Sequence, residues 1–230
     1  MNWSAAVTEL FAGQAPELLL FDLDGTLIDS VPDLAAAIDQ MLKHFGREPA
    51  GVTNVSHWVG NGADQLIRRA LTAGDEDAAN ALAASEVEPW RQVFDDAYLS
   101  ALHRATGVYP GVQALLDQLS LPAVLITNKP RLFTLPLLQS LGWQEHFAGV
   151  ICGDDLAEKK PSALPLLHAC EQQRCAPQAA LMIGDSRNDI AAAKAAAVAS
   201  VAVSYGYNHG EDIALSQPDL LLDNLLELLA

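Results

Sequence analysis

The sequence contains six short apolar runs, each long enough for a strand but too short for a helix. In the first of them, Leu18-Leu19-Leu20-Phe21, no polar residue alternates with the apolar ones. Such a run is typical of a strand that is covered on both faces, as in a parallel sheet. The pattern therefore predicts strands at 18–21, 123–127, 149–152, 180–184, 200–204 and 220–222.

Apolar residues recur at helical spacing between these runs. The clearest case begins near Ser30, where Pro32 suits the first turn of a helix and Gly46 suits its end. Asp33 is placed for a capping box with Ser30. Further helices are expected at 5–11, 63–71, 75–99, 111–119, 130–141 and 164–173, at 189–197, and at the C-terminus.

The order of these elements predicts an α/β fold with an inserted helical unit. Alternating strands and helices favour a Rossmann-like, doubly wound parallel sheet with helices on both faces. No strand pattern appears between residues 46 and 102, so this stretch is expected to be all helical. We therefore expect a core of residues 1–31 and 103–230, and a helical cap of residues 32–102 that leaves and re-enters the core through two neighbouring connections.

Composition and charge narrow the range of partners. The chain has 230 residues, of which 50% are hydrophobic, and a formal net charge of −16. So acidic a surface argues against nucleic acid or an anionic membrane as partner. The apolar runs are also far too short to span a bilayer. A small phosphorylated metabolite would need a local positive site, and the sequence leaves open whether the protein is a monomer or a homodimer.

The cysteines predict a reducing compartment. There are only three, Cys152, Cys170 and Cys175, and none of them forms a CxxC pair. This odd number without metal-ligand spacing favours free thiols in a cytoplasmic protein.

A pair of acids follows the first predicted strand directly. Asp22 and Asp24 lie two residues apart, so their side chains leave an extended backbone on the same side, and Gly25 then allows a sharp turn. Mg²⁺ would compensate the repulsion between two such carboxylates. A plain turn is the alternative. A calcium-binding EF-hand loop is excluded, because Leu27 and Asp33 stand where that loop has Gly and Glu.

Polar side chains also follow the next three predicted strands. Ligands of doubly wound sheets bind beyond the carboxyl ends of the strands, so these side chains are expected to meet. Each of them alone has an ordinary alternative as a helix cap or a solvated charge, but their recurrence favours a common site. They are Thr127 and Asn128 after the second strand, Lys159 and Lys160 after the third, and Asp185 and Asp189 after the fourth.

These segments resemble the four motifs of the haloacid dehalogenase superfamily, over nearly the whole chain. The motifs are Asp22-Leu23-Asp24-Gly25-Thr26, Thr127-Asn128, Lys160-Pro161 and Gly184-Asp185-Ser186-Arg187-Asn188-Asp189. Within the superfamily the chain is most similar to bacterial phosphoglycolate phosphatases. The segments that carry this similarity are Val59-Gly60-Asn61-Gly62-Ala63-Asp64, Thr127-Asn128-Lys129-Pro130, Gly153-Asp154-Asp155 and Tyr205-Gly206-Tyr207-Asn208. The chain departs from this subgroup at Ser162-Ala163, where a His or Asp and then a Pro are usual.

The resemblance implies a Mg²⁺-dependent phosphoric monoester hydrolase that converts 2-phosphoglycolate to glycolate. Asp22 would be the nucleophile that forms an aspartyl-phosphate, and Asp24 the general acid and base. The resemblance implies that Mg²⁺ is held by Asp22, Asp24 (through its backbone carbonyl) and Asp185. It also implies that Thr127, Asn128 and Lys160 contact the phosphoryl oxygens, that Asp189 supports Lys160 or a metal-bound water, and that Thr26 holds Asp24 by a hydrogen bond and lies close to the substrate.

The cap is expected to select the substrate. Asn61 and Gly62 could bring backbone close to a small ligand, although an ordinary turn is the alternative. Arg69, or its neighbour Arg68, could bind a substrate carboxylate in bidentate fashion, and solvated arginines on a helix are the alternative.

Four other functions compete with this interpretation. Another small phosphomonoester, such as a phosphosugar, could be the substrate. A sugar phosphomutase of similar architecture usually has Asp-Gly-Val or Asp-Gly-Ile in the first motif, whereas this chain has Asp24-Gly25-Thr26, which argues against a phosphomutase. A phospho-accepting signalling domain has about half this length and no inserted cap. A dinucleotide-binding module would depend on Gly60 and Gly62, which follow no predicted strand.

Overall fold

The computed structural model describes residues 2–230 and contains the parallel sheet that the sequence predicts. Six strands pair in the order β5-β4-β1-β6-β7-β8, and every neighbouring pair is parallel. The α/β fold class is thus confirmed. The strands are β1 (Leu18–Phe21), β4 (Ala123–Ile126), β5 (Gly149–Ile151), β6 (Ala180–Gly184), β7 (Ala199–Val203) and β8 (Leu220–Leu222).

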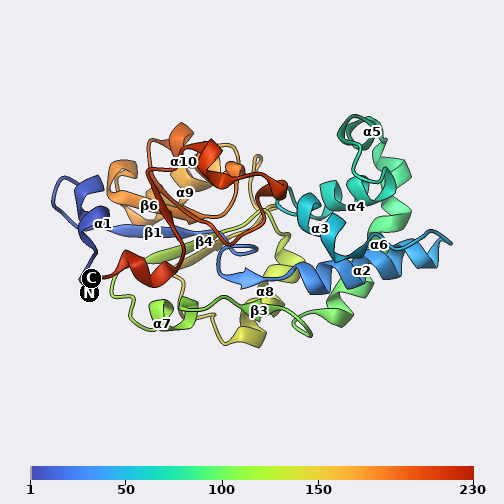
Figure 1. Ribbon diagram of the computed structural model, residues 1–230, viewed down its shortest axis with the longest axis horizontal. Helices are drawn as coiled ribbons and strands as arrows, with labels where there is room; N and C mark the ends of the chain where they lie inside the picture. The colour runs from blue at the N-terminus through green and yellow to red at the C-terminus, as the bar shows by residue number, and fades with distance from the viewer. Residues whose placement is uncertain (1) are drawn as a thin grey trace.

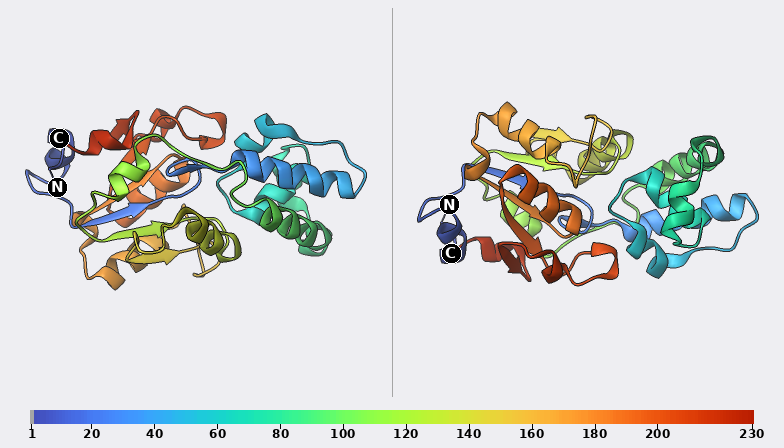
Figure 2. Two further views of the ribbon diagram at one scale, coloured as in Figure 1. Left: turned by 90° about the horizontal axis from the view of Figure 1, so that it is seen from below. Right: turned by 90° about the horizontal axis from the view of Figure 1, so that it is seen from above.

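Helices cover both faces of this sheet (Figures 1 and 2). Alternate residues of β1 point to opposite faces. Leu19 and Phe21 pack with one set of helices, and Leu18 and Leu20 pack with the other. The first set comprises α1 (Ala5–Leu10), α7 (Val112–Leu116), α8 (Arg131–Leu141) and the 3₁₀ helix η4 (Leu225–Leu228), and the second comprises α9 (Leu164–Gln173) and α10 (Arg187–Ala196).

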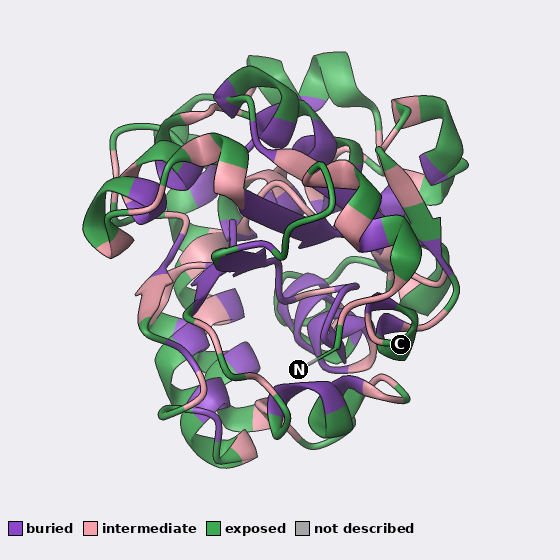
Figure 3. Cartoon of the chain, turned by 90° about the vertical axis from the view of Figure 1, so that its left-hand side faces the viewer, coloured by how far each residue is buried: buried purple, intermediate pink, exposed green. Residues whose placement is uncertain are grey.

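The burial pattern follows from this layering. The sheet strands form a buried centre, and exposed positions concentrate on the outer faces of the helices, as Figure 3 shows. The predicted C-terminal helix is only the single 3₁₀ turn of η4. Three other 3₁₀ turns lie in loops, η1 (Pro177–Ala179), η2 (Asn208–Gly210) and η3 (Ile213–Ser216).

Five helices form a separate cluster beyond one edge of the sheet (Figure 1). The five helices are α2 (Val31–His44), α3 (Gly51–Trp58), α4 (Ala63–Leu71), α5 (Glu76–Ala81) and α6 (Ala84–Ala101). Helices α2, α3, α4 and α6 share an apolar core of their own, to which α8 contributes Phe133, and α5 lies outside that core.

Along residues 2–230, no helix combines the length and the apolar character needed to cross a bilayer.

Three details of this helical cluster differ from the sequence-based expectation. Helix α3 was not expected at all. The single helix expected over 75–99 is two helices, because Leu82 and Ala83 are extended and Glu86 accepts the backbone N–H of Ala83, which starts α6 anew. The capping box of Ser30 and Asp33 is absent, since both side chains bind residues outside the helix.

The two chain connections to this cluster lie side by side. Strand β2 (Ile28–Asp29) pairs antiparallel with β3 (Gly107–Val108). Next to this pair, the buried carboxylate of Asp33 accepts the backbone N–H groups of Ala105 and Thr106 at 2.9 Å each, and the Thr106 hydroxyl at 2.7 Å. The helical cluster is thus tied to the sheet by a short, hydrogen-bonded double connection.

Candidate active site

The polar residues that follow the strands do meet at one edge of the sheet. Asp22 follows β1, Thr127 follows β4 and Asp185 follows β6, and these three strands are parallel neighbours. All three side chains are buried. The loop after β5 adds Lys160 to the same place, as the sequence led us to expect.

Lys160 is the central cation of this cluster. Its buried ammonium donates hydrogen bonds to Asp22 Oδ1 and to the backbone carbonyl of Ile126, both at 2.6 Å. It also forms an ion pair with Asp189 Oδ1 at 2.6 Å. The neighbouring Lys159 points elsewhere and donates to the backbone carbonyl of Asn61 at 2.7 Å.

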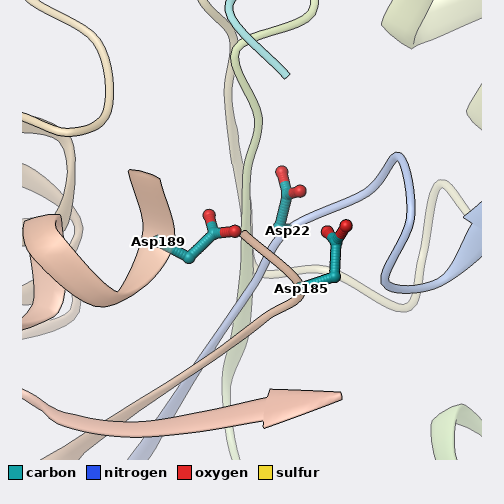
Figure 4. Close-up of side chains that lie close together, drawn as sticks. All are labelled: Asp22, Asp185 and Asp189. Carbon is teal, nitrogen blue, oxygen red and sulfur yellow. The ribbon is translucent and has the colours of Figure 1, made fainter. Parts of the chain in front are cut away.

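Three buried carboxylates lie close together (Figure 4), and Lys160 contacts two of them. Asp22, Asp185 and Asp189 each offer one oxygen, and these three oxygens lie within 4.8 Å of one another. Lys160 Nζ, 2.6 Å from Asp189 Oδ1 and 2.6 Å from Asp22 Oδ1, is the cation that these carboxylates share. Three acidic oxygens at this spacing, with a single lysine between two of the carboxylates, fit a divalent cation with oxygen ligands.

The protonation behaviour of the carboxylates agrees with a cation site. Burial raises the pKa of Asp22 well above its usual range, although the ammonium of Lys160 opposes the shift. Burial and the carboxylate of Asp189 raise the pKa of Asp185 to about 7, against hydrogen bonds from the Tyr207 backbone N–H and the Thr26 hydroxyl. A divalent cation would supply the positive charge that these ionised carboxylates need.

Two glycines allow the backbone to pass close to Asp185. A Cβ atom on Gly25 would lie 2.3 Å from Asp185 Oδ2, and one on Gly206 would lie 2.1 Å from Asp185 Cβ. Gly25 also has a φ of +92°, which side chains rarely tolerate. Any other residue at these two positions would push the Asp185 carboxylate out of the cluster.

Asp24 lies outside this carboxylate cluster and has its own partners. Its carboxylate accepts hydrogen bonds from the Ser30 hydroxyl and from Lys129 Nζ, the latter at 2.9 and 3.1 Å to its two oxygens. The prediction that Thr26 holds Asp24 is wrong, because the Thr26 hydroxyl donates to Asp185 Oδ1 at 2.9 Å. The tight turn at Gly25 directs Thr26 toward β6.

Lys129 is the second buried cation of the site. Its desolvation alone would lower its pKa, but the charge of Asp24 outweighs that effect, so the net shift is upward and the side chain is an ammonium ion. Lys129 also lies 4.9 Å from the ring centroid of Tyr98. The ammonium of Lys129 is thus held between Asp24 of the first motif and Tyr98 of helix α6.

Thr127 and Asn128 differ in what they can offer a phosphoryl group. The Thr127 hydroxyl oxygen accepts the Lys129 backbone N–H at 3.1 Å, which leaves its proton available. The Asn128 amide nitrogen donates to the backbone carbonyls of Gly60 and Lys160, both at 2.9 Å. Both protons of this amide group are therefore used to join loops, and the expected contact with a phosphoryl oxygen would need a rearrangement.

A cavity opens between these residues and the helical cluster. Asp22, Asp24, Thr127, Asn128 and Lys160 lie on its sheet side, together with Lys129, Ser186, Asn188 and Asp189. The opposite side is largely apolar and is formed by Leu34, Val59, Gly60, Gly62, Ala63, Leu66, Phe94, Tyr98 and Phe133.

The predicted cap residues divide into those that line the cavity and those that do not. Gly62 lines it, whereas Asn61 and Arg69 lie behind its wall. The Arg69 guanidinium is buried and bonds to both Glu76 oxygens, to the Trp58 carbonyl and to Asn61 Oδ1. Four of the five N–H donors of Arg69 are therefore used by these partners, and the side chain does not line the cavity. Arg68 is likewise bound, to Asp64 and to the carbonyls of Ala79 and Leu82.

Sequence reasoning assigned no role in the site to Lys129, Ser30 or Tyr98. Lys129 follows Thr127-Asn128 directly and is a cation beside a motif, which is the one local signal that pointed to it. Ser30 and Tyr98 carry no local signal for the site, because they reach it only through the double connection of β2 and β3 and the packing of α6.

Comparison with known proteins agrees with this geometry. Residues 19–203 match the model of the haloacid dehalogenase-like hydrolase family. The chain is 48% identical over 224 residues to the phosphoglycolate phosphatase of Pseudomonas fluorescens (strain Pf0-1), covering 96% of this chain and 81% of that protein. It is 46% identical over 228 residues to phosphoglycolate phosphatase 1 of Pseudomonas aeruginosa, covering 98% of this chain and 83% of that protein.

A solved structure has the same fold. It is a crystal structure described as a predicted phosphoglycolate phosphatase from Haemophilus somnus, with a TM-score of 0.84 and 36% sequence identity. The alignment covers 90% of this chain and 94% of that one. The family match runs from β1 to the end of β7 and includes the helical cluster and all four motifs, and the chain therefore belongs to the haloacid dehalogenase-like hydrolase family.

Proposed function

We propose that the protein is a Mg²⁺-dependent phosphoric monoester hydrolase that converts 2-phosphoglycolate to glycolate and phosphate. The observation that carries the proposal is the Asp22 carboxylate bonded to Lys160 at 2.6 Å, inside a cluster with Asp185 and Asp189. Several relatives that are 44–49% identical bear the name phosphoglycolate phosphatase, which supports this substrate.

In this proposal Asp22 is the nucleophile. One carboxylate oxygen of Asp22 forms a bond to phosphorus while the bond from phosphorus to the ester oxygen breaks, which gives an aspartyl-phosphate and an alkoxide. Lys160 holds Asp22 in one orientation and places positive charge where the transferred group develops negative charge. Water then attacks phosphorus and releases phosphate and free Asp22.

Asp24 handles the protons. Asp24 must carry a proton when the substrate is bound and gives this proton to the departing alkoxide oxygen. It takes a proton back from the water that attacks phosphorus as the bond between phosphorus and Asp22 breaks. Ser30 and Lys129 fix the orientation of its carboxylate. The Thr127 hydroxyl donates to a phosphoryl oxygen.

Asp22, Asp185 and the backbone carbonyl of Asp24 would hold Mg²⁺, with Asp189 close by. The ion would neutralise the charge between the anionic nucleophile and the anionic phosphoryl group. Thr26 and the Tyr207 backbone N–H keep Asp185 pointed into the site, at 2.9 and 2.8 Å.

We also propose a division into a catalytic core, residues 1–31 and 103–230, and a cap, residues 32–102. The double connection of β2 and β3 would serve as the hinge. Closure of the cap would exclude water other than the nucleophile and admit only a small substrate. The three free cysteines support a protein of the cytoplasm. The net charge of −16 argues against nucleic acid or an anionic membrane as partner, and we propose a small phosphorylated metabolite as the partner of a monomeric or homodimeric protein.

The test is phosphate release from 2-phosphoglycolate and from a series of phosphosugars, with Mg²⁺ and with a chelator. We expect 2-phosphoglycolate to have the highest kcat/KM, activity to require the metal, and Asp22→Asn to be inactive. A higher kcat/KM for a phosphosugar would transfer the assignment to a phosphosugar phosphatase. Inertness toward every ester offered would refute the hydrolase.

A further inference from the structure

We propose that Lys129 and Tyr98 form the subsite that recognises the carboxylate of the substrate. This inference rests on the proposed function, because it concerns the part of the substrate that remains after the phosphoryl group has been transferred. Arg69 and Arg68, the residues that sequence alone suggested for this task, have their guanidinium groups bonded within the cap.

Lys129 has the position and the charge that the subsite needs. It lines the same cavity as the proposed nucleophile Asp22, and its side chain is 4% exposed. The other buried lysine of the cavity, Lys160, has three partners on the sheet side: Asp22, Asp189 and the Ile126 carbonyl. Lys129 Nζ donates to the two oxygens of Asp24 at 2.9 and 3.1 Å and otherwise faces the ring of Tyr98, so one of its three N–H groups can donate to a second carboxylate.

Tyr98 supplies a donor that the folded chain does not use. Its side chain is fully buried, and its hydroxyl makes no hydrogen bond with residues 2–230. Tyr98 lines the cavity from helix α6, beside Lys129. A buried hydroxyl without a partner costs stability, and an acceptor on a ligand would remove that cost.

The remaining cavity wall excludes larger polar substrates. On the cap side it is formed by the apolar side chains of Leu34, Leu66, Phe94 and Phe133. A phosphosugar would place several hydroxyl groups against these side chains without hydrogen-bond partners. A two-carbon acid has a single polar end, which fits the one cation and one hydroxyl that this wall offers.

The binding test uses two ligands that differ only at the proposed contact. In 3-phosphonopropionate a methylene group replaces the ester oxygen of 2-phosphoglycolate, and in propylphosphonate a methyl group also replaces the carboxylate. We expect Lys129→Met to weaken binding of 3-phosphonopropionate about 30-fold and Tyr98→Phe about 5-fold, as for charged and neutral hydrogen bonds. The Kd of propylphosphonate should change less than about 3-fold in either variant. Isothermal titration calorimetry would measure the Kd of both ligands.

Controls separate recognition from orientation of Asp24. Lys159→Met removes a nearby exposed lysine and should leave the preference for the carboxylate ligand intact, and Lys129→Arg should retain part of that preference. Equal losses for both ligands would overturn the inference and leave Lys129 as a positioning residue for Asp24. Tyr98→Phe removes a single oxygen, so it remains informative if Lys129→Met does not fold.

A kinetic comparison distinguishes failure of the inference from failure of the proposed function. Wild-type protein should hydrolyse 2-phosphoglycolate with a much higher kcat/KM than ethyl phosphate, and Lys129→Met should lose most of that ratio. Hydrolysis of both esters with similar kcat/KM would overturn the subsite and leave the phosphatase in place. Absence of phosphate release from either ester would overturn the phosphatase itself.

Discussion

Asp22 and Asp24 are identical side chains two residues apart, and their neighbours separate their chemistry. Asp22 is bonded to Lys160 within a cluster of carboxylates, whereas Asp24 is bonded to Ser30 and Lys129 on the cap side of the site. The first environment suits a nucleophile next to a cation, and the second suits a group that exchanges protons with the leaving group and with water.

Asp24→Asn should lower kcat for 2-phosphoglycolate by at least about 100-fold, because an amide cannot deliver the proton that the alkoxide needs. Steady-state phosphate release would measure the loss, and circular dichroism would confirm that the variant is folded. Asp117→Asn, at an exposed aspartate outside the cavity, is the matched control and should be fully active. Normal turnover by Asp24→Asn would contradict the proton-transfer role.

Asp185 predicts how Mg²⁺ binding depends on pH. Its pKa is raised from 3.8 to about 7 in the metal-free fold. Protonated Asp185 therefore contributes stability that is fully present below the pKa of the unfolded chain, 3.8. This stability is lost as the pH rises through the pKa of the folded chain, about 7. Mg²⁺ would bind the ionised form, so the metal should raise Tm more at about pH 8 than at about pH 6.

Thermal unfolding with and without Mg²⁺ at these two pH values tests this prediction. Asp185→Asn carries no titratable group at this position and should show a smaller metal effect without the pH dependence. An equal Tm increase at both pH values in the wild-type protein would argue against Asp185 as a ligand.

At single positions, sequence reasoning was informative for backbone placement and weaker for side-chain direction. Asp22 and Asp185 meet because β1 and β6 are parallel neighbours, and Lys160 reaches them from the loop after β5, which is separated from β1 by β4. A parallel sheet with ligands beyond the carboxyl ends of its strands can be expected from a strand-helix pattern. Thr26 could not be assigned correctly, because its direction depends on the turn at Gly25. Lys129 could not be assigned because its partner Asp24 lies 105 residues away in the sequence.

At the scale of elements, helices with a local sequence pattern could be predicted, whereas a helix that depends on a distant residue could not. Helix α4 was predicted with its observed limits, since its apolar face repeats within the segment. Helix α3 begins where Asp39, on α2, accepts the backbone N–H groups of Ala50 and Gly51 at 2.7 and 3.0 Å. A helix start supported by a residue on another helix leaves no local pattern, and for that reason α3 could not be predicted.

The hinge provides a prediction at this scale. Asp33→Ala should lower the free energy of unfolding by about 2 kcal/mol, because it leaves the backbone N–H groups of Ala105 and Thr106 and the Thr106 hydroxyl without their acceptor, and both groups of Thr106 are buried. Thr106→Val, which removes only the hydroxyl, should cost about 1 kcal/mol. Urea unfolding would measure both values. An unchanged stability of Asp33→Ala would show that the hinge does not depend on this carboxylate.

At the scale of the whole molecule, the net charge is negative, whereas two buried lysines of the cavity are positive. The chain carries a net charge of −16, while the cavity contains the buried cations Lys129 and Lys160. The overall field repels an anionic substrate, and attraction begins only at short range inside the cavity. Capture of the substrate therefore depends on local contacts rather than on long-range steering.

Salt should consequently favour the reaction slightly. Raising the KCl concentration from about 20 to about 300 mM should leave kcat/KM for 2-phosphoglycolate unchanged or raise it up to about twofold, because salt screens the exposed acids more than the buried lysines. Phosphate release at a fixed Mg²⁺ concentration measures this. A steep fall of kcat/KM with salt would instead indicate electrostatic steering by a positive surface.

The loop between α3 and α4 gives the molecule a limit on substrate size. The carbonyl of Gly60 in this loop accepts the amide groups of Asn128 and Asn188, at 2.9 and 3.2 Å, from two different motif loops of the sheet. A phosphorylated protein or nucleic acid carries the same kind of ester, but its bulk would keep this loop away from both amides. The contact would thus exclude substrates that are too large for the closed loop. A cell that contains this enzyme would keep its phosphorylated macromolecules intact while small phosphorylated metabolites are hydrolysed.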